Sequence, residues 1–182
     1  RPYCASCGKP VDAEGRLCAD CAASPRSFDR AYAACLYEGS LKELIHSFKF
    51  GATLPLEKFL SSLMISFLRD NDEVIRGVDL ITFVPLHTRR ARDRGFNQSQ
   101  LLAREVAVAF NAGVTDTLIR RARRKHQNML SREMRLTNLA GAFTAREEIE
   151  LTGRTVLLID DVMTTGATLD ECARVLKDAG AA

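Results

Sequence analysis

Residues 155–168 constrain the fold of this chain more than any other stretch. An apolar run at residues 155–159 is followed directly by Asp160 and Asp161, and then by a turn rich in Thr and Gly. A continuous run of Val, Leu and Ile is typical of a strand buried on both faces of a parallel sheet. Thr168 followed by Glu171 predicts a capped helix after the turn. This strand-turn-helix unit predicts an α/β fold.

The rest of the chain carries a compatible alternation of patterns. Ser40 with Glu43 forms a capping-box pattern, which predicts the start of a helix that Gly51 ends. Apolar residues at helical or strand spacing predict the other elements. Helices are expected over residues 41–50, after Pro55 and over residues 98–110, and strands over residues 31–37, 80–84 and 116–120.

The chemistry of residues 160–168 follows from their place at the end of a strand. Ligands of open parallel sheets bind beyond the carboxyl ends of the strands. Asp160 and Asp161 can accept hydrogen bonds from vicinal ribose hydroxyls or hold a magnesium ion. The amides and hydroxyls of residues 164–168 can surround a phosphate at a helix N-terminus, and Gly166 permits close approach of the backbone. A diol at one end and a phosphate at the other describe a ribose 5-phosphate.

Known motifs with similar residues fit this segment less well. A receiver domain would place its acids near the first strand and lacks the Thr-Thr-Gly turn. A Walker-type loop needs Gly-Lys-Ser or Gly-Lys-Thr, which the sequence lacks, and it contains no GxGxxG pattern either. An ordinary capped turn does not account for two adjacent acids at a buried strand end.

Four cysteines near the N-terminus form two Cys-x-x-Cys pairs: Cys4, Cys7, Cys18 and Cys21. Four thiolates at this spacing predict a tetrahedral structural zinc ion, which would supply most of the folding free energy of residues 1–24. Disulfides or a redox pair are the alternatives, and disulfides need an oxidising compartment. Cys35 and Cys172 are interpreted as small buried hydrophobic residues, since Cys172 shares a helical face with Leu169 and Leu176.

Composition and charge limit the function classes. The chain has 182 residues, 46% hydrophobic and 27% charged, which is typical of one globular domain with a small appendage. No apolar run is long enough to span a bilayer, and a cytoplasmic protein without membrane insertion is expected. Residues 89–135 hold twelve basic and four acidic side chains, a net charge of +8 within a chain of net charge +3. This basic segment suits pyrophosphate or nucleic acid, although a solvated Arg-rich face is the simpler alternative.

Residues 156–168 resemble the PRPP motif of type I phosphoribosyltransferases, with four hydrophobic residues, two acids and a Thr-Thr-Gly loop. Together with the four cysteines, the chain is similar to the ComF family of competence proteins. The other segments that carry this resemblance are residues 48–51, 84–87, 94–98 and 127–143. The resemblance implies a type I phosphoribosyltransferase-like parallel sheet flanked by helices, with a small N-terminal zinc ribbon. It also implies phosphoribosyl pyrophosphate (PRPP) with magnesium as the ligand, and in some bacteria a part in handling transforming single-stranded DNA.

The resemblance implies roles for individual residues. Asp160 and Asp161 would bind the ribose hydroxyls and act as the catalytic acid pair, while pyrophosphate leaves C1 through an oxocarbenium-like transition state. The other expected PRPP contacts are Val162, Met163, Thr164, Thr165, Gly166, Ala167 and Thr168 in the motif, and Leu86, His87, Thr88, Arg89 and Arg94 in a pyrophosphate loop. A flexible basic loop that closes over the site is expected at Arg124, Lys125, Gln127, Arg132 and Arg135.

The expected domains are a zinc ribbon at residues 1–24 and a phosphoribosyltransferase-like domain at residues 25–182. Because the chain stops at residue 182, the next C-terminal strand of the family is expected to be missing. Three functions remain open. The first is a phosphoribosyltransferase of nucleotide metabolism or DNA uptake, acting on an unidentified nitrogenous acceptor. The second is a non-catalytic PRPP-binding module that handles single-stranded DNA, and the third is a zinc-dependent adaptor for a competence ATPase or another DNA-uptake protein.

Overall fold

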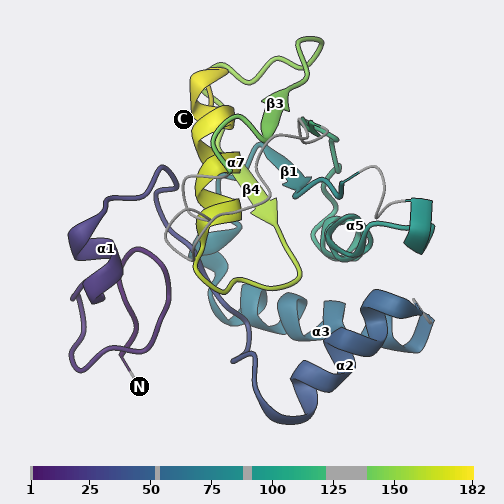
Figure 1. Ribbon diagram of the computed structural model, residues 1–182, viewed down its shortest axis with the longest axis horizontal. Helices are drawn as coiled ribbons and strands as arrows, with labels where there is room; N and C mark the ends of the chain where they lie inside the picture. The colour runs from purple at the N-terminus through teal and green to yellow at the C-terminus, as the bar shows by residue number, and fades with distance from the viewer. Residues whose placement is uncertain (1, 52–53, 88–91, 122–138) are drawn as a thin grey trace, which may run out of the picture.

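The computed structural model describes residues 2–51, 54–87, 92–121 and 139–182. At its centre, β1 (Leu80–Phe83) and β4 (Val156–Ile159) pair in parallel, with Leu80 opposite Val156. Val114 adds a parallel bridge to Ile81 on the other side of β1. Figure 1 shows β1 and β4 between α7 (Ala167–Asp178) and α5 (Gln98–Ala109). The predicted parallel α/β architecture is therefore confirmed.

Alternate residues of β4 face two different cores. Leu157 and Ile159 pack into a cluster with residues of α5, α2 (Gly39–Phe50) and α3 (Leu54–Asp70). Leu158 packs on the opposite side, where Cys172 and Leu176 of α7 lie. Because both faces of β4 are covered, its sequence has no polar positions until the strand ends.

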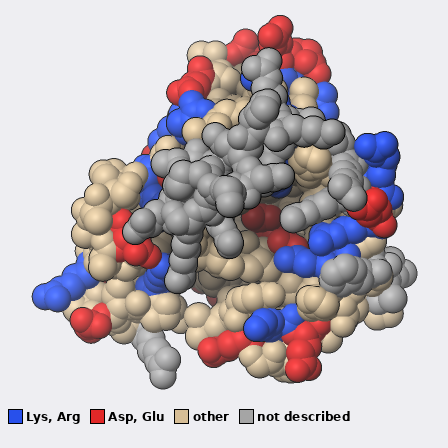
Figure 2. All heavy atoms as spheres, in the orientation of Figure 1, with Lys and Arg blue, Asp and Glu red and all other residues tan. Residues whose placement is uncertain are grey.

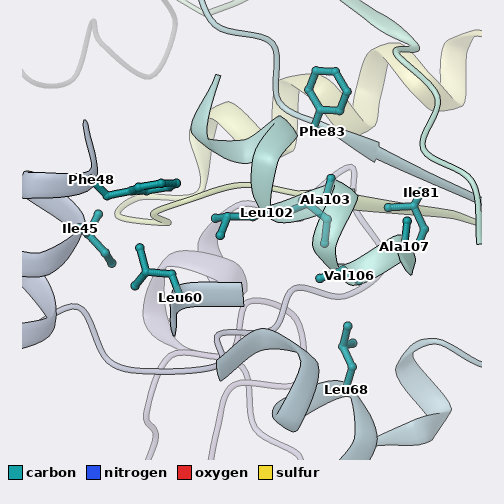
Figure 3. Close-up of a cluster of buried hydrophobic side chains, with 11 residues drawn as sticks. Ile45, Phe48, Leu60, Leu68, Ile81, Phe83, Leu102, Ala103, Val106 and Ala107 are labelled. Atoms are coloured by element: carbon teal, nitrogen blue, oxygen red, sulfur yellow. The ribbon is translucent and has the colours of Figure 1, made fainter. Parts of the chain in front are cut away.

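The larger core lies between the helices on one side of the sheet. Figure 3 shows Ile45 and Phe48 of α2 converging with Leu60 of α3 and Leu102 of α5. Phe48 is fully buried, and Leu102 is 3% exposed. Burial of these side chains fixes the C-terminal end of α2 beside the carboxyl end of β4. None of the described helices combines the length and apolar composition needed to cross a bilayer.

A second, antiparallel pair joins β2 (Leu118–Arg120) to β3 (Phe143–Ala145). The strand predicted near residues 116–120 is confirmed, whereas β3 was not predicted. Phe143 is buried against the face of α7 that carries Cys172, which confirms the interpretation of this cysteine as a packed hydrophobic residue.

The strand predicted over residues 31–37 is wrong, because these residues form an irregular connection. The amide of Ala31 donates to the carbonyl of Ser6, and the ring of Tyr32 lies 5.9 Å from that of Phe67 in α3. Tyr32 thus packs on a helix instead of pairing in a sheet. Cys35 is exposed, so its predicted burial is also wrong.

Both predicted helix caps differ from the structure. Glu38 is the N-cap of α2, without a side-chain cap bond, so Ser40 lies inside the helix. Gly166 is the N-cap of α7 and adopts φ = 77°, a left-handed conformation that glycine reaches without strain. The Glu171 carboxylate instead accepts from the amide of Gly141 at 2.7 Å, so it ties α7 to the segment before β3.

Candidate functional site

Two carboxylates emerge where β4 ends. Asp160 follows Ile159 directly, and its Oδ1 accepts a hydrogen bond of 2.9 Å from the Ser99 hydroxyl. The same oxygen accepts from the backbone amide of Asp161 at 2.9 Å. Asp161 Oδ2 lies 3.2 Å from Nζ of Lys49, and this pair is largely shielded, since the side chains are 16% and 24% exposed. The site therefore joins β4, the first turn of α5 and the end of α2.

The fold disfavours ionisation of Asp160. Burial at the strand end and the charge of Asp161 raise the pKa of Asp160 to about 6 from its ordinary value of 3.8. The hydrogen bond from Ser99 and the charge of Lys49 act in the opposite direction. Near neutral pH the carboxylate is thus charged but poorly solvated, so it can accept strongly from ligand hydroxyls or bind a cation.

The loop after the acids has the geometry of an anion site. It lines a small hollow together with Asp160, formed by residues 162–169. Gly166 turns the chain into α7, and the amide of Ala167 donates to Oγ1 of Thr165 at 3.4 Å. Backbone amides at the start of a helix and the positive end of its dipole can bind phosphate here. The structure thus brings the predicted acid pair and the predicted phosphate loop to one place.

Acidic and basic atoms lie together on the face of the molecule shown in Figure 2. In Figure 2, acidic atoms lie in a hollow near the middle of the face, where β4 ends in Figure 1, with basic atoms beside them. Because charges of both signs lie on this face, a ligand with a neutral sugar and anionic ends can find complementary groups.

The start of α5 organises the neighbouring loop. Asn97 caps this helix, and its side-chain amide donates to the carbonyl of Val84 at the end of β1. Gln98 accepts from Arg94 at 3.3 Å and donates to the carbonyl of Lys49 at 3.4 Å. Arg94 is thereby tied to the first turn of α5. The sequence alone did not indicate roles for Lys49 or Ser99, because their distance from β4 depends on helix packing.

Other predicted contacts are placed only in part. Leu86 and His87 follow β1 without regular secondary structure, at the same end of the sheet as the acids. Thr88 and Arg89 of the predicted pyrophosphate loop lie outside the described residues. The predicted flexible basic loop also lies outside them: Arg124, Lys125, Gln127, Arg132 and Arg135.

The four N-terminal cysteines form a compact cluster, and one of them, Cys21, lies in α1 (Ala19–Ala23). Their sulfur atoms all lie within 4.8 Å of one another, and those of Cys7 and Cys18 are 3.6 Å apart. A tetrahedral zinc site with Zn–S bonds of about 2.3 Å needs sulfur atoms roughly 3.8 Å apart, whereas a disulfide needs about 2.0 Å. The arrangement is compatible with a zinc ribbon.

Backbone amides prepare this cluster for a cation. The amide of Cys18 donates to Sγ of Cys4 at 3.2 Å. Burial opposes ionisation of Cys4, but backbone hydrogen bonds outweigh it and lower the pKa of this thiol. Burial and the neighbouring sulfur atoms raise the pKa of Cys7. A divalent cation would supply the charge that lets all four thiols ionise.

Comparisons with known proteins agree with this geometry. The phosphoribosyl transferase domain family matches residues 94–182, which include β4, the acid pair and α7. Competence protein F of Haemophilus influenzae is 31% identical over 98% of this chain and 80% of its own length. DNA utilization protein YhgH of Escherichia coli is 33% identical over the whole chain and 81% of its length. Competence protein ComFC of Streptococcus pneumoniae is 28% identical over 80% of this chain and 60% of its length.

Proposed function

We propose that this chain, which belongs to the ComF family of competence proteins and contains a phosphoribosyl transferase domain, binds PRPP with magnesium and transfers its phosphoribosyl group to an acceptor. One observation carries the proposal. A poorly solvated acid pair and a phosphate-type loop lie in sequence at the end of one parallel strand. This spacing suits a ribose ring whose vicinal hydroxyls face one end and whose 5-phosphate faces the other.

In this proposal each group acts on a different part of the ligand. Asp160 and Asp161 accept hydrogen bonds from the ribose hydroxyls and hold the ring, and their charge offsets the positive charge that develops on it. The amides and hydroxyls from Thr164 to Thr168 hold the 5-phosphate, and Arg94 approaches the pyrophosphate. Bound magnesium would neutralise charge on the departing pyrophosphate. The C1–oxygen bond to pyrophosphate breaks, and the acceptor nitrogen supplies the electron pair of the new bond.

The remaining parts have supporting roles in this proposal. A zinc ion held by Cys4, Cys7, Cys18 and Cys21 stabilises a ribbon at residues 1–24, and residues 25–182 form the phosphoribosyltransferase-like domain. Leu86 and His87, with Thr88 and Arg89, belong to the pyrophosphate loop. The protein acts in the cytoplasm.

Calorimetric titration of PRPP with magnesium tests the proposal directly. The wild type is expected to bind, and an Asp160→Asn, Asp161→Asn double variant is expected to lose at least about 100-fold in affinity, because two charge-assisted hydrogen bonds are weakened. Glu147→Asn, an exposed change just beyond β3, is the matched control. Equal affinity of the double variant and the wild type would refute the assignment of the acid pair. Pyrophosphate release from PRPP over a panel of nucleobases then identifies the acceptor.

A second candidate is a PRPP-binding protein that handles single-stranded DNA without transfer chemistry. It is favoured by the names of the relatives, which refer to competence and DNA utilization, and by the net charge of +8 in residues 89–135. This candidate predicts that the protein binds a fluorescent single-stranded oligonucleotide and that the affinity falls steeply with rising salt concentration, as counterion release requires. PRPP binding without pyrophosphate release across the whole panel, together with this salt dependence, would favour it over the transferase.

A further inference from the structure

The cysteine cluster and the phosphate loop share a packed interface. Met163 lies in the loop between the acid pair and Gly166, yet it packs against the buried cysteines. Phe28, from the connection after the cysteines, packs against the same cluster. Residues separated by more than 130 positions in the sequence therefore belong to one small hydrophobic group.

Arg26 adds a polar connection between the same two parts. One guanidinium nitrogen donates to the carbonyl of Thr165 at 3.3 Å, and another lies 3.6 Å from the carboxylate of Asp170. Burial opposes the charge of Arg26, but the nearby Cys21 and Asp170 outweigh it and raise the pKa of the guanidinium. The side chain is only 12% exposed, and among the described residues its Nε, which is buried, has no hydrogen-bond partner. A buried arginine in this position is unusual unless its contacts have a role.

The bond to Thr165 bears on how the loop receives an anion. In a planar trans peptide, the carbonyl and the following amide point in opposite directions. By holding the carbonyl of Thr165, Arg26 also fixes the direction of the amide of Gly166. Loops of this kind bind phosphate through such amides, so their orientation before binding affects affinity.

Two further contacts anchor the connection to α7. The amide of Ser27 donates to Asp170 Oδ1 at 2.6 Å, and Lys177 pairs with Asp29 at 2.6 Å. Asp170 lies in the first turn of α7, directly after the loop. Movement of the connection would therefore be transmitted to the start of the helix as well as to the loop.

We infer that Arg26 is a positioning residue that couples the cysteine cluster to the phosphate loop, so that metal binding at the cysteines and phosphate binding at the loop strengthen each other. The inference rests on the proposed binding of PRPP. A tetrathiolate site with a divalent cation has a formal charge of −2, and the adjacent guanidinium offsets part of it, as partners of metal ligands commonly do. Without the metal, the cysteine cluster attracts the Arg26 guanidinium less strongly, and the hydrogen bond from Arg26 to the carbonyl of Thr165 weakens.

The coupling is measurable from both sides, because linkage is reciprocal. Removal of zinc with a chelator is expected to weaken PRPP binding by the full-length protein about tenfold, within the usual range of coupling between sites. Saturating PRPP is expected to raise zinc affinity by the same factor in competition with a chromophoric chelator. Circular dichroism and urea unfolding of the zinc-free protein check that the sheet and its helices remain folded.

Two substitutions test whether zinc and PRPP binding are coupled through Arg26 or whether the connection only stabilises the loop. Arg26→Met with zinc bound is expected to bind PRPP about as weakly as the zinc-free wild type, and zinc removal should then change its affinity less than twofold. Arg30→Met is the matched control, because Arg30 lies in the same connection but donates to the carbonyl of Ala5 and lies over the ring of Tyr32. This variant should retain the affinity of the wild type and its response to zinc.

Three outcomes overturn the inference. PRPP affinity that is independent of zinc would exclude the coupling. Arg26→Met and zinc removal each lower PRPP affinity by some factor. If the two factors multiply when both changes are made, Arg26 and zinc act independently. Equal losses of PRPP affinity in the Arg26 and Arg30 variants would indicate that the connection stabilises the loop in a general way, without a specific role for Arg26. Absence of PRPP binding by the zinc-loaded wild type would instead refute the proposed function, and zinc affinity with and without inorganic phosphate would still test the coupling.

Discussion

Replacing Asp160 with asparagine is expected to stabilise the fold while it weakens ligand binding. Oδ1 of Asp160 accepts from the Ser99 hydroxyl and from the amide of Asp161 at 2.9 Å each. The amide oxygen of asparagine can occupy the same position and accept the same two bonds. The substitution therefore removes a charge that the fold solvates poorly and changes little else.

The magnitude follows from the pKa of Asp160, which burial and Asp161 raise from 3.8 to about 6. Since the folded-state pKa is the higher one, this carboxyl contributes its full stability below pH 3.8 and loses it as the pH rises through 6. A difference of about two pKa units corresponds to about 3 kcal/mol above pH 6. Partial exposure and weaker hydrogen bonds to the uncharged amide reduce this gain, so the variant should be about 1–3 kcal/mol more stable at pH 8. At pH 4 the difference should be below about 0.6 kcal/mol.

Urea unfolding of the wild type and Asp160→Asn at pH 8 and pH 4 measures this difference. Glu147→Gln, which removes one exposed negative charge, is the control for net charge. A variant that is less stable than the wild type at pH 8 would refute the reasoning, as would a gain of equal size at both pH values. The same preparations titrated with PRPP should show that the more stable protein binds PRPP more weakly, as expected where function requires a group that destabilises the fold.

Three further predictions concern the groups around the site. Phe48→Ala should lower the free energy of unfolding by about 3–5 kcal/mol, because the ring is fully buried between the helices, and urea unfolding measures this loss. Thr117→Val should cost about 1–3 kcal/mol in the same assay, because the buried hydroxyl of Thr82 loses its 2.7 Å partner and keeps only a 3.5 Å contact from the amide of Thr117. A Thr82→Val, Thr117→Val double variant should not recover this loss, because it also removes the acceptor of that amide. Lys49→Met should raise the pKa of Asp160 above 6, because it removes a nearby positive charge, whereas Lys49→Arg should not. The carboxyl carbon shift in NMR measures this pKa, and an unchanged value in Lys49→Met would show that Lys49 does not stabilise the charge of Asp160.

Local sequence patterns predicted the elements that depend on a few consecutive residues. The run before Asp160 indicated a strand buried on both faces, and β4 lies between two cores. The Cys-x-x-Cys spacing indicated a four-sulfur cluster, which the structure contains. The aromatic residues near Tyr32 gave a wrong strand, because the same composition suits packing on a helix. The Thr168 cap was also wrong, since Gly166 reaches the required conformation earlier in the chain.

The order of strand, acids, loop and helix follows from local sequence, because each of these is set by residues within one or two turns of one another. The contacts of Lys49 and Ser99 with the acid pair, and the contact of Arg26 with the carbonyl of Thr165, arise only when the chain is folded. Those contacts link residues far apart in the chain, and their distances depend on how whole helices pack on the sheet. The raised pKa of Asp160 has the same origin, because burial by several elements at once sets the cost of its charge.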